Sequence, residues 1–313
     1  MPTHNTHSIA SAIGALSLVA VAFLSGVGAV SVLDTINRNI SNTASVAHAF
    51  PTTLSVDPAS LTAKAAIVYD PTTHQVLYEK NAYTSLPIAS LAKLVTATAI
   101  LDRVIGNPTI TITKDDLVQN GAESDADFVP GNRIKLHDLL EIGLIASSNS
   151  AMQAAARMLG TNYTDVLQAT AFGLGIKDME FHNGTGLDVT TSTAGAYGSA
   201  YDIALIAANF AKQHPEYFNL TQKPDVTIPA GWGGTISAHA TNLPLQDMPG
   251  LIGAKTGYTD LAGGNIVALF DLEVGHPIVI AVLGSTQTAR FTDTELLLAA
   301  ARATLSASKN HTQ

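Results

Sequence analysis

The order of hydrophobic patterns along the chain is the feature that most limits its fold. Short runs rich in β-branched and aromatic residues lie at both ends of the region that starts near Ala59, and helical patterns lie between them. The first two runs, 65–70 and 75–79, flank Pro71-Thr-Thr-His74, which predicts a hairpin. Strands at both ends with helices between them predict one α+β domain, whose sheet joins the two ends of the chain.

Within this region the apolar spacing separates helices from strands. A helix is predicted after Pro87, where apolar residues recur at steps of three and four. Further helical patterns lie at His137–Ala146, Ser150–Leu159, Thr164–Phe172, Ser199–Lys212 and Phe291–Ser306. Later strands are predicted at Asp225–Ile228, Gly234–Ala238, Ile252–Tyr258, Asn265–Leu269 and Pro277–Leu283.

Composition excludes several classes of protein. The 313 residues are 46% hydrophobic and 13% charged, which is enough for one large domain or two small ones. A net charge of −9 without any Lys/Arg-rich run argues against a nucleic-acid partner. The lack of cysteine excludes disulfides, thiolate metal sites and a cysteine nucleophile. The ten histidines are scattered, with no His-Glu-x-x-His, so we expect no zinc site, and no cofactor is predicted.

The N-terminal segment predicts a membrane anchor. Ser8 to Leu33 is uncharged and mostly apolar, and as a helix it would be about 39 Å long, enough to cross a bilayer with tilt. We expect residues 1–33 to remain as an anchor and the polar residues 34–58 to form a flexible stalk. The alternative is a long cleaved signal that ends at Ala47-His48-Ala49, although the chain lacks the basic start of a usual signal peptide.

Ser90 and Lys93 are the first candidates for catalysis. They lie three residues apart near the start of the predicted helix, so one turn places both on the same face and lets the amine touch the hydroxyl. A serine hydroxyl becomes a good nucleophile when a base takes its proton, and a lysine acts as that base if burial or a second cation lowers its pKa. The helix N-terminus also favours negative charge at Ser90. Alone the pattern is weak, because a chain of this length contains Ser-x-x-Lys about once by chance, and the polar tail repeats it at Ser306–Lys309.

A second candidate, Ser147-Ser148-Asn149, lies where one helical pattern stops and another starts. A turn there projects a hydroxyl and an amide into a cleft, where Ser147 would relay a proton to a leaving amine and Asn149 would hold a substrate amide. The alternative is that these residues are helix caps, since Ser and Asn are favoured at cap positions. The triplet alone favours the cap interpretation.

A third candidate, Lys255-Thr256-Gly257, lies in a predicted strand and occurs once. Lys255 would supply the second cation that lowers the pKa of Lys93, or would hold a substrate carboxylate. Thr256 would hydrogen-bond that carboxylate, and Gly257 would leave room for the Ser90 helix or the substrate backbone. The alternative is a solvated lysine followed by a turn glycine at the end of a strand.

Together the three elements resemble the penicillin-recognising serine enzymes, which carry Ser-x-x-Lys, Ser-x-Asn and Lys-Thr-Gly in this order. The flanking sequences resemble those of D-alanyl-D-alanine carboxypeptidases, the low-molecular-mass penicillin-binding proteins of peptidase family S11. This resemblance runs from about Ala59 to Ala303 and includes Gly186-Leu-Asp188, Thr241-Asn-Leu243 and Gly253-Ala-Lys-Thr-Gly-Tyr-Thr-Asp260. It implies a fold like that of serine β-lactamases and penicillin-binding proteins: a mainly antiparallel sheet flanked by helices, with a helical subregion inserted.

The resemblance implies a role for each candidate residue. The implied catalytic residues are Ser90 as the acylated nucleophile, Lys93 as the general base, and Ser147. The residues implied for substrate binding are Asn149, Lys255, Thr256, Gly257, Tyr258 and Arg290. Among these, the backbone N–H groups of Ser90 and Tyr258 would form the oxyanion hole, and Arg290 would lie near the substrate carboxylate.

Three positions depart from the family's usual pattern. Ser150 stands where an acid is usual, Tyr258 where a histidine is common, and Ala92 where a threonine is frequent. The first departure affects local hydrogen bonding at the second motif. The second matters little if only the backbone of Tyr258 takes part.

The implied activity is that of a serine DD-carboxypeptidase, which removes the terminal D-Ala from a peptidoglycan stem peptide ending in D-Ala-D-Ala through an acyl-enzyme on Ser90. β-Lactams would acylate the same serine and act as inhibitors. Three alternatives remain open: a class A-like β-lactamase, a DD-endopeptidase that uses the same residues, and an inactive penicillin-binding or sensor module. A class A-like enzyme needs a glutamate in Glu-x-x-x-Asn, and the nearest candidate, Glu180-Phe-His-Asn183, is one residue short.

The implied location is the cell membrane, with the catalytic domain outside the cytoplasm. Arg38 after the apolar segment weakly favours the opposite orientation by the positive-inside rule, but an enzyme that acts on the cell wall has to face it. We expect residues 59–308 to form the catalytic domain, residues 309–313 a polar tail, and the N-terminal segment the anchor. Cleavage of that segment would make the protein secreted.

Overall fold

Residues 53–117, 128–273 and 275–310 are described by the computed structural model. The chain divides into two compact units, Met1–Ala49 and Phe50–Gln313, and all of the described residues belong to the second. The predicted anchor, the alternative cleavage site and most of the predicted stalk lie outside the described residues. Within the described part, every helix is too short or too polar to cross a bilayer.

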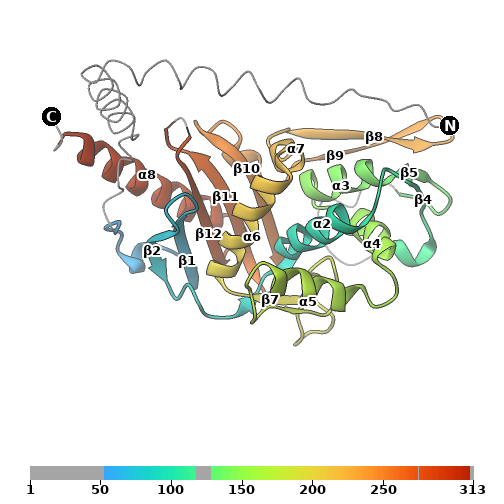
Figure 1. The fold of residues 1–313 in the computed structure, drawn as a ribbon, viewed down its shortest axis with the longest axis horizontal. Coiled ribbons are helices and arrows are strands. Elements are labelled where there is room, and N and C mark those ends of the chain that lie inside the picture. The colour runs from blue at the N-terminus through green and yellow to red at the C-terminus, as the bar shows by residue number, and fades with distance from the viewer. Residues whose placement is uncertain (1–52, 118–127, 274, 311–313) are drawn as a thin grey trace, which may run out of the picture. The chain divides into compact units, whose positions relative to one another are not determined.

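A five-stranded antiparallel sheet forms the centre of the described unit (Figure 1), with the strand order β10-β11-β12-β1-β2. Its strands are β1 (Ala65–Asp70), β2 (Gln75–Lys80), β10 (Leu251–Thr259), β11 (Gly263–Asp271) and β12 (Pro277–Ser285). The first and last of these strands along the chain are neighbours, because β1 pairs with β12 in a register that sets Ile67 opposite Ala281. The predicted hairpin and the prediction that one sheet joins the two ends of the region are therefore confirmed.

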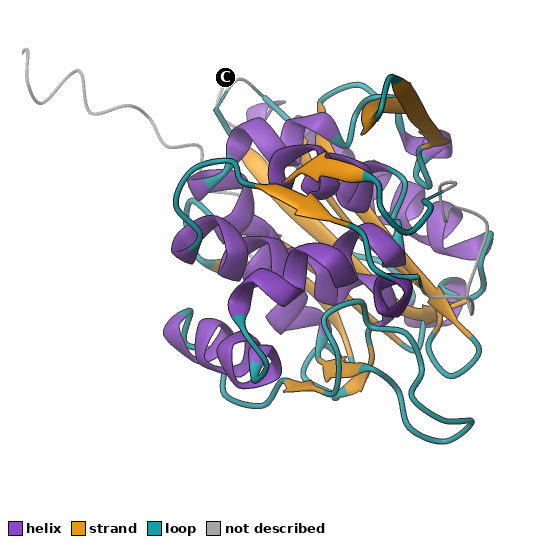
Figure 2. Cartoon of the chain, turned by 90° about the vertical axis from the view of Figure 1, so that its right-hand side faces the viewer, coloured by secondary structure: helices purple, strands orange, loops and turns teal. Residues whose placement is uncertain are grey.

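Helices cover both faces of this sheet (Figures 1 and 2). Helix α6 (Ala200–Gln213) packs against β1, β11 and β12, and helix α8 (Ala289–Asn310) packs against β11 and β12. Alternate side chains of β1 point to opposite faces, so Ile67 joins the apolar cluster that contains α6, whereas Val68 joins the cluster that contains α8. Burial on both faces explains why β1 and β12 are nearly continuous apolar runs.

The helical subregion is inserted between β2 and β10 along the chain. Its helices are α2 (Ala92–Arg103), α3 (Leu136–Ile145), α4 (Asn149–Ala156), α5 (Tyr163–Gly173) and α7 (Pro215–Leu220). Small sheets accompany them, with the strands β3 (Leu86–Pro87), β4 (Thr109–Thr111), β5 (Arg133–Lys135), β6 (Glu180–Phe181), β7 (Ala196–Gly198), β8 (Asp225–Gly231) and β9 (Gly234–His239). The predicted helices and later strands are confirmed, with ends that differ by a few residues. Helix α7 and strands β3 to β7 were not predicted, because such short runs do not show a hydrophobic period.

The start of the domain differs from the prediction. Residues 34–58 were expected to form a stalk, but the Leu54 N–H donates to the Leu77 carbonyl at 2.7 Å and the Leu54 side chain is buried. Val56 also packs on the apolar cluster beneath α8. Leu54 and Val56 therefore attach the chain to the sheet, and the packed domain includes residues that precede Ala59.

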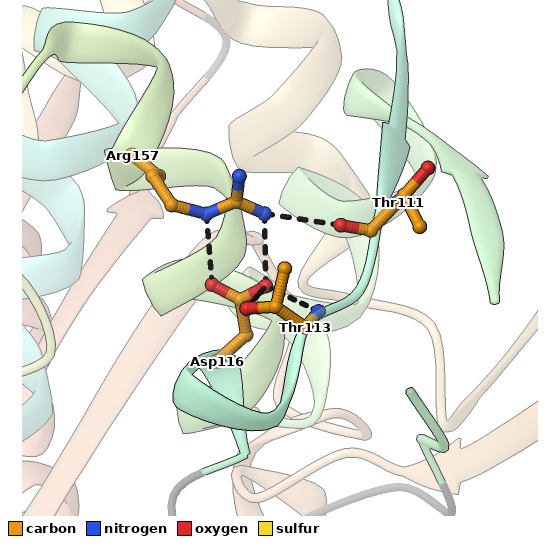
Figure 3. Close-up of polar contacts among 4 residues, drawn as sticks. All are labelled: Thr111, Thr113, Asp116 and Arg157. Carbon is orange, nitrogen blue, oxygen red and sulfur yellow. Dashed lines mark hydrogen bonds and ion pairs between the residues drawn. The ribbon is translucent and has the colours of Figure 1, made fainter. Parts of the chain in front are cut away.

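An ion pair between the buried Asp116 and the half-exposed Arg157 fixes the end of α4 to the segment after β4 (Figure 3). The buried Asp116 carboxylate accepts hydrogen bonds from Arg157 Nε at 3.0 Å and Nη2 at 2.8 Å, which is bidentate geometry. The same carboxylate accepts the Thr113 N–H and hydroxyl, and Arg157 Nη2 also donates to the Thr111 carbonyl at 3.1 Å. Because α4 begins at Asn149, this ion pair supports a helix that carries a predicted site residue.

A second buried carboxylate joins α8 to the start of the domain. Asp293 accepts the N–H groups of Thr62 and Ala63, both at 3.0 Å, and the Ser285 hydroxyl at 2.7 Å. The residue is buried, so these three donors replace the water that the carboxylate loses on folding. The contact ties the segment before β1 to the end of β12 and to α8.

We expect Asp293→Ala to lower the free energy of unfolding by about 3 kcal/mol, because it leaves the buried Ala63 N–H and Ser285 hydroxyl without their acceptor. Chemical denaturation followed by circular dichroism measures this loss. The control is Asp57→Ala, since the Asp57 carboxylate also accepts a backbone N–H, that of Ala59 at 2.9 Å, but is exposed. Its loss should cost no more than about 1 kcal/mol, and equal losses in the two variants would contradict the role assigned to Asp293.

Candidate active site

Ser90 lies in a short turn that precedes helix α2. The turn is the 3₁₀ segment η2 (Ala89–Leu91), and Ala89 in it has a φ of 48°, in the left-handed region. Lys93 Nζ donates to Ser90 Oγ at 2.6 Å, so the predicted contact across one helical turn is confirmed. The Ser90 hydroxyl therefore meets an amine rather than capping the helix.

The Lys93 amine is buried among polar groups from three segments of the chain. Lys93 is 0% exposed, and besides Ser90 its Nζ donates to Asn149 Oδ1 at 2.8 Å and to the Thr185 carbonyl at 2.9 Å. These acceptors come from the turn η2, from α4 and from the segment 183–188. The amine is thus held in one position by groups that lie far apart in the sequence.

The second motif divides into a cap and two site residues. Ser148 caps α4, since its Oγ accepts the Ala151 N–H at 3.2 Å. Ser147 has a φ of 61° and its Oγ accepts a hydrogen bond from Lys255 Nζ at 2.7 Å, while Asn149 faces Lys93. The cap interpretation therefore holds for Ser148 only.

Lys255 is the second buried lysine of the site. It is 1% exposed, and its Nζ donates to Ser147 Oγ and to the Thr256 carbonyl at 2.8 Å. Burial lowers the pKa of Lys255 well below the ordinary lysine value, and the positive charges of Lys93 and Arg290 lower it further. The alternative of a solvated lysine is wrong, and two cations lie close together as expected.

Two glycines allow the backbone to approach Ser90 closely. A Cβ on Gly257 of strand β10 would lie 3.0 Å from both the Ile88 carbonyl oxygen and the Ser90 nitrogen. A Cβ on Gly186, which has a φ of 80°, would lie 1.8 Å from the Ala89 carbonyl oxygen. Strand β10 and the segment 183–188 therefore contact the Ser90 turn directly, as predicted for Gly257.

The segment 183–188 is part of the site, although in the sequence it stands out only as one of the flanking sequences that resemble the family. Asn183 Oδ1 accepts the N–H groups of Thr185 at 3.1 Å and Gly186 at 2.7 Å, which fixes the turn that presents the Thr185 carbonyl to Lys93. Asp188 then accepts the Thr259 hydroxyl at 2.9 Å, at the end of β10. A backbone carbonyl that accepts a hydrogen bond cannot be identified from the sequence. The sequence features that indicated this segment were Gly186 and Asp188.

Most of the predicted site residues line one cavity of about 640 Å³. Those that line it are Ser90, Ser147, Asn149, Thr256, Gly257, Tyr258 and Arg290, together with Leu187, His239, Ala240, Thr241, Leu243, Pro244, Gln287, Thr288 and Phe291. Lys93 and Lys255 lie behind this wall, and their amines reach the lining hydroxyls of Ser90 and Ser147. The structure therefore brings together all of the candidates from the three motifs.

Arg290 lies near the start of α8 and supports strand β10. It is buried, its Nη1 donates to the Gly257 carbonyl at 2.9 Å, and its guanidinium lies over the Phe291 ring at 4.8 Å. Thr256 Oγ1 meets Thr241 Oγ1 at 2.5 Å on the same wall of the cavity. The site therefore combines a hydroxyl that contacts an amine with a positively charged wall. This combination suits nucleophilic attack on an acyl group that has a carboxylate nearby.

We expect Lys255→Met to change how stability depends on pH. A lysine whose pKa falls on folding binds fewer protons in the folded than in the unfolded state, from its folded pKa up to the ordinary value of 10.5. Through that window, the free energy of unfolding of the parent protein should rise with pH relative to the variant, by at most about 1.4 kcal/mol per pH unit. Urea denaturation of both proteins at neutral and mildly alkaline pH measures the difference.

The control for this experiment is Lys223→Met. Lys223 is a half-exposed lysine whose Nζ pairs with Glu141 at 2.8 Å, so its removal should leave the pH dependence of stability nearly unchanged. If the parent and Lys255→Met kept a constant difference across the same pH range, the lowered pKa of Lys255 would be refuted.

A profile of the peptidase S11 D-alanyl-D-alanine carboxypeptidases matches residues 52–287. The chain is 28% identical over 229 residues to D-alanyl-D-alanine carboxypeptidase DacD of Escherichia coli, covering 68% of this chain and 56% of that protein. It is 30% identical over 224 residues to DacB2 of Mycobacterium tuberculosis, covering 71% of this chain and 74% of that protein. The chain thus spans little more than half the length of DacD.

Solved structures share the fold. The D-alanyl-D-alanine carboxypeptidase of Mycobacterium tuberculosis H37Rv gives a TM-score of 0.70 at 25% identity, covering 80% of this chain and 93% of that one. PBP3 of Streptococcus pneumoniae gives 0.68 at 30% identity, covering 78% and 72%. Penicillin-binding protein D2 of Listeria monocytogenes, solved with ampicillin bound, gives 0.66 at 28% identity, covering 77% and 97%. The expected fold class is confirmed.

Proposed function

Because the chain belongs to the S11 family of D-alanyl-D-alanine carboxypeptidases, we propose that it removes the terminal D-Ala from peptidoglycan stem peptides through an acyl-enzyme on Ser90. The observation that carries the proposal is the pair of lysine–serine contacts at one cavity, Lys93 to Ser90 at 2.6 Å and Lys255 to Ser147 at 2.7 Å. Both serines precede a helix, Ser90 before α2 and Ser147 before α4, so the choice of Ser90 as the nucleophile rests on its place in the family's Ser-x-x-Lys motif.

In the acylation step, Ser90 Oγ attacks the carbonyl carbon of the penultimate D-Ala while Lys93 Nζ accepts the hydroxyl proton. The 2.6 Å contact between these atoms is a distance at which a proton transfers. The N–H groups of Ser90 and Tyr258 are the proposed donors to the oxyanion. The close approach of Gly257 to the Ser90 nitrogen supports this, because it holds strand β10 beside the turn.

In the second half of the reaction, the C–N bond breaks and the terminal D-Ala leaves with the proton taken from Ser90. Lys93 delivers that proton directly or through the Ser147 hydroxyl, which lines the same cavity. Water then attacks the ester carbonyl while Lys93 accepts a proton from it. The ester C–O bond then breaks, Lys93 returns that proton to Ser90 Oγ, and the shortened peptide leaves with a free carboxylate.

The free carboxylate of the terminal D-Ala is proposed to face Lys255, Thr256 and Arg290. Thr256 and Arg290 line the cavity, and Lys255 lies directly behind Ser147. The positive charge of Arg290, and that of Lys255 in its protonated form, favours a substrate that ends in a carboxylate. Asn149, which also lines the cavity, is proposed to hold an amide of the peptide.

β-Lactams are proposed to acylate Ser90 and to be released slowly. Of the residues that the structure describes, those lining the cavity include no carboxylate that would activate a deacylating water. Glu180, the nearest match to the class A pattern, has a 61% exposed side chain that pairs with His182 at 3.0 Å. The β-lactamase alternative is therefore less favoured than the carboxypeptidase.

The proposed location follows from the substrate. Peptidoglycan lies outside the cytoplasm, so the catalytic unit is proposed to be extracytoplasmic. The apolar segment Ser8 to Leu33 supports attachment to the cell membrane through the N-terminal part of the chain.

We expect Ser90→Ala to abolish release of D-Ala from a pentapeptide that ends in D-Ala-D-Ala, by about 10⁴-fold or more in kcat, because the nucleophile is lost. Product analysis by mass spectrometry measures turnover, and labelled penicillin with peptide mapping locates the adduct. The control is Ser192→Ala, an exposed serine in a loop, which should keep full activity. A penicillin adduct on any residue other than Ser90, or turnover by Ser90→Ala, would sink the proposal.

We expect Gly257→Ala to slow acylation by penicillin about 10- to 100-fold, because the new Cβ pushes strand β10 away from the Ser90 nitrogen and misplaces the oxyanion donors. The rate constant for labelled-penicillin binding measures the effect, and far-ultraviolet circular dichroism shows that the fold remains. Gly173→Ala is the matched control, since a Cβ there meets no atom within 4 Å. An unchanged acylation rate in Gly257→Ala would exclude the proposed donor geometry.

A further inference from the structure

The β8–β9 hairpin ends in a turn whose sequence does not suit its backbone. Gly231 pairs with Gly234, so the loop consists of Trp232 and Gly233, whose φ angles are 54° and 88°. Two-residue turns with positive φ at both positions favour Asn, Asp or Gly, and a bulky residue there is strained. Tryptophan therefore does not stabilise this turn, which favours a role for its side chain in binding.

Trp232 is both exposed and fixed. The residue is 83% exposed, yet its Nε1–H donates to the Gly131 carbonyl at 3.0 Å. This bond holds one edge of the indole and leaves most of the ring surface in contact with solvent. An aromatic surface already held in one orientation loses little conformational entropy when a ligand stacks on it.

The hairpin connects this indole with the catalytic cavity. Figure 1 shows β8 and β9 running from the end of the sheet past α3 towards β4 and β5. At the other end of β9, His239 lines the cavity. Alternate residues of a strand share a face, so the face of His239 continues through Ser237 and Thr235 to the turn, and all three are exposed.

This face of the hairpin is polar and suits a peptide rather than an apolar partner. The Ser237 hydroxyl meets the Thr227 hydroxyl at 2.8 Å, and the pair between His239 and Asp225 lies at the cavity end. The only large apolar side chain exposed on β8, β9 or their turn is Trp232, within the part of the chain that the structure describes. A ligand that follows this face away from the cavity thus meets hydroxyls and then reaches the turn that carries Trp232.

The length of the hairpin is comparable with the reach of the proposed substrate. Trp232 and His239 are seven positions apart, which corresponds to at most about 23 Å along the hairpin. The first four residues of a stem pentapeptide, up to the scissile carbonyl, span about 14 Å when extended. The linker and the sugars of the glycan strand extend that reach beyond the peptide, so sugars lie within range of the turn when a peptide occupies the cavity.

We propose that Trp232 is a sugar-binding site, on which a ring of the glycan strand stacks while its stem peptide occupies the catalytic cavity. One face of a hexosamine ring presents C–H groups, which pack against the indole as apolar surface. The inference rests on the proposed function for the role of the peptide, but the contact with sugar is tested without any peptide. The competing explanation is that Trp232 only braces the hairpin against Gly131.

The chain offers a direct test, because Trp232 is its one tryptophan. Titration of the full chain with peptide-free glycan oligomers of at least four sugars should give a saturable change in tryptophan fluorescence. Maltotetraose is the control sugar for non-specific effects and should give a much smaller change. Fluorescence that stays constant up to millimolar concentrations of the glycan oligomer would overturn the proposal, whatever the protein does to peptides.

The kinetic test separates stacking from bracing. Trp232→Ala should raise KM for glycan strands that carry pentapeptides about five- to tenfold, and should leave kcat/KM for free pentapeptide within about twofold. Trp232→Phe, which keeps a ring but loses the bond to Gly131, should stay within about twofold of the parent on both substrates. Phe172→Ala removes another exposed ring, 63% exposed on α5, and should change neither.

The outcomes of the two tests are distinct. Equal losses on both substrates in Trp232→Ala and in Trp232→Phe would identify a brace and overturn the sugar site. Failure to release D-Ala from free pentapeptide would refute the proposed function, while the fluorescence titration would still decide whether the turn binds sugar.

Discussion

Two buried lysine amines control the geometry of the site. Moving an amine out of water costs free energy, which is offset only where acceptors lie at hydrogen-bonding distance. Lys93 takes its acceptors from η2, α4 and the segment 183–188, and Lys255 takes one from the junction of α3 and α4. The sheet and the helical subregion therefore cannot shift against each other without leaving a buried amine unsatisfied. The same contacts that place the reacting groups also hold the two parts together.

Burying the lysines of the site lowers the free energy of unfolding, and packing in the rest of the domain offsets this loss. Burial and two neighbouring positive charges lower the pKa of Lys255, which means that its protonated form is unfavourable where it lies. Stabilising contacts are found elsewhere: β1 and β12 are buried on both faces, and the carboxylates of Asp116 and Asp293 are satisfied by several donors each. Such a division between a costly site and a well-packed frame is common where function needs unfavourable local structure.

Backbone strain is also found at the site. Among the described residues other than glycine, positive φ occurs at Ala89, Ser147 and Trp232, besides His74 and Asn81 in the loops around β2. Ala89 precedes the nucleophile and Ser147 faces Lys255, so both lie where strain is held in place by the hydrogen bonds of the site. The third, Trp232, lies at the far end of the hairpin that begins at the cavity. Strain there supports a functional role for the indole, and with it a binding surface that extends from the cavity along β9.

The sequence by itself determined the order of strands and helices, because hydrophobic periodicity is a local property, and it determined the Ser90–Lys93 contact, because one helical turn sets it. The resemblance to a family singled out Ser147 and Lys255, but neither position shows from its neighbours whether it is a cap, a solvated side chain or part of a site. Only the tertiary structure decided that, by bringing the two residues to 2.7 Å across 108 positions of chain. It alone also revealed the Thr185 carbonyl, since every residue has a carbonyl and only packing selects the one that meets an amine.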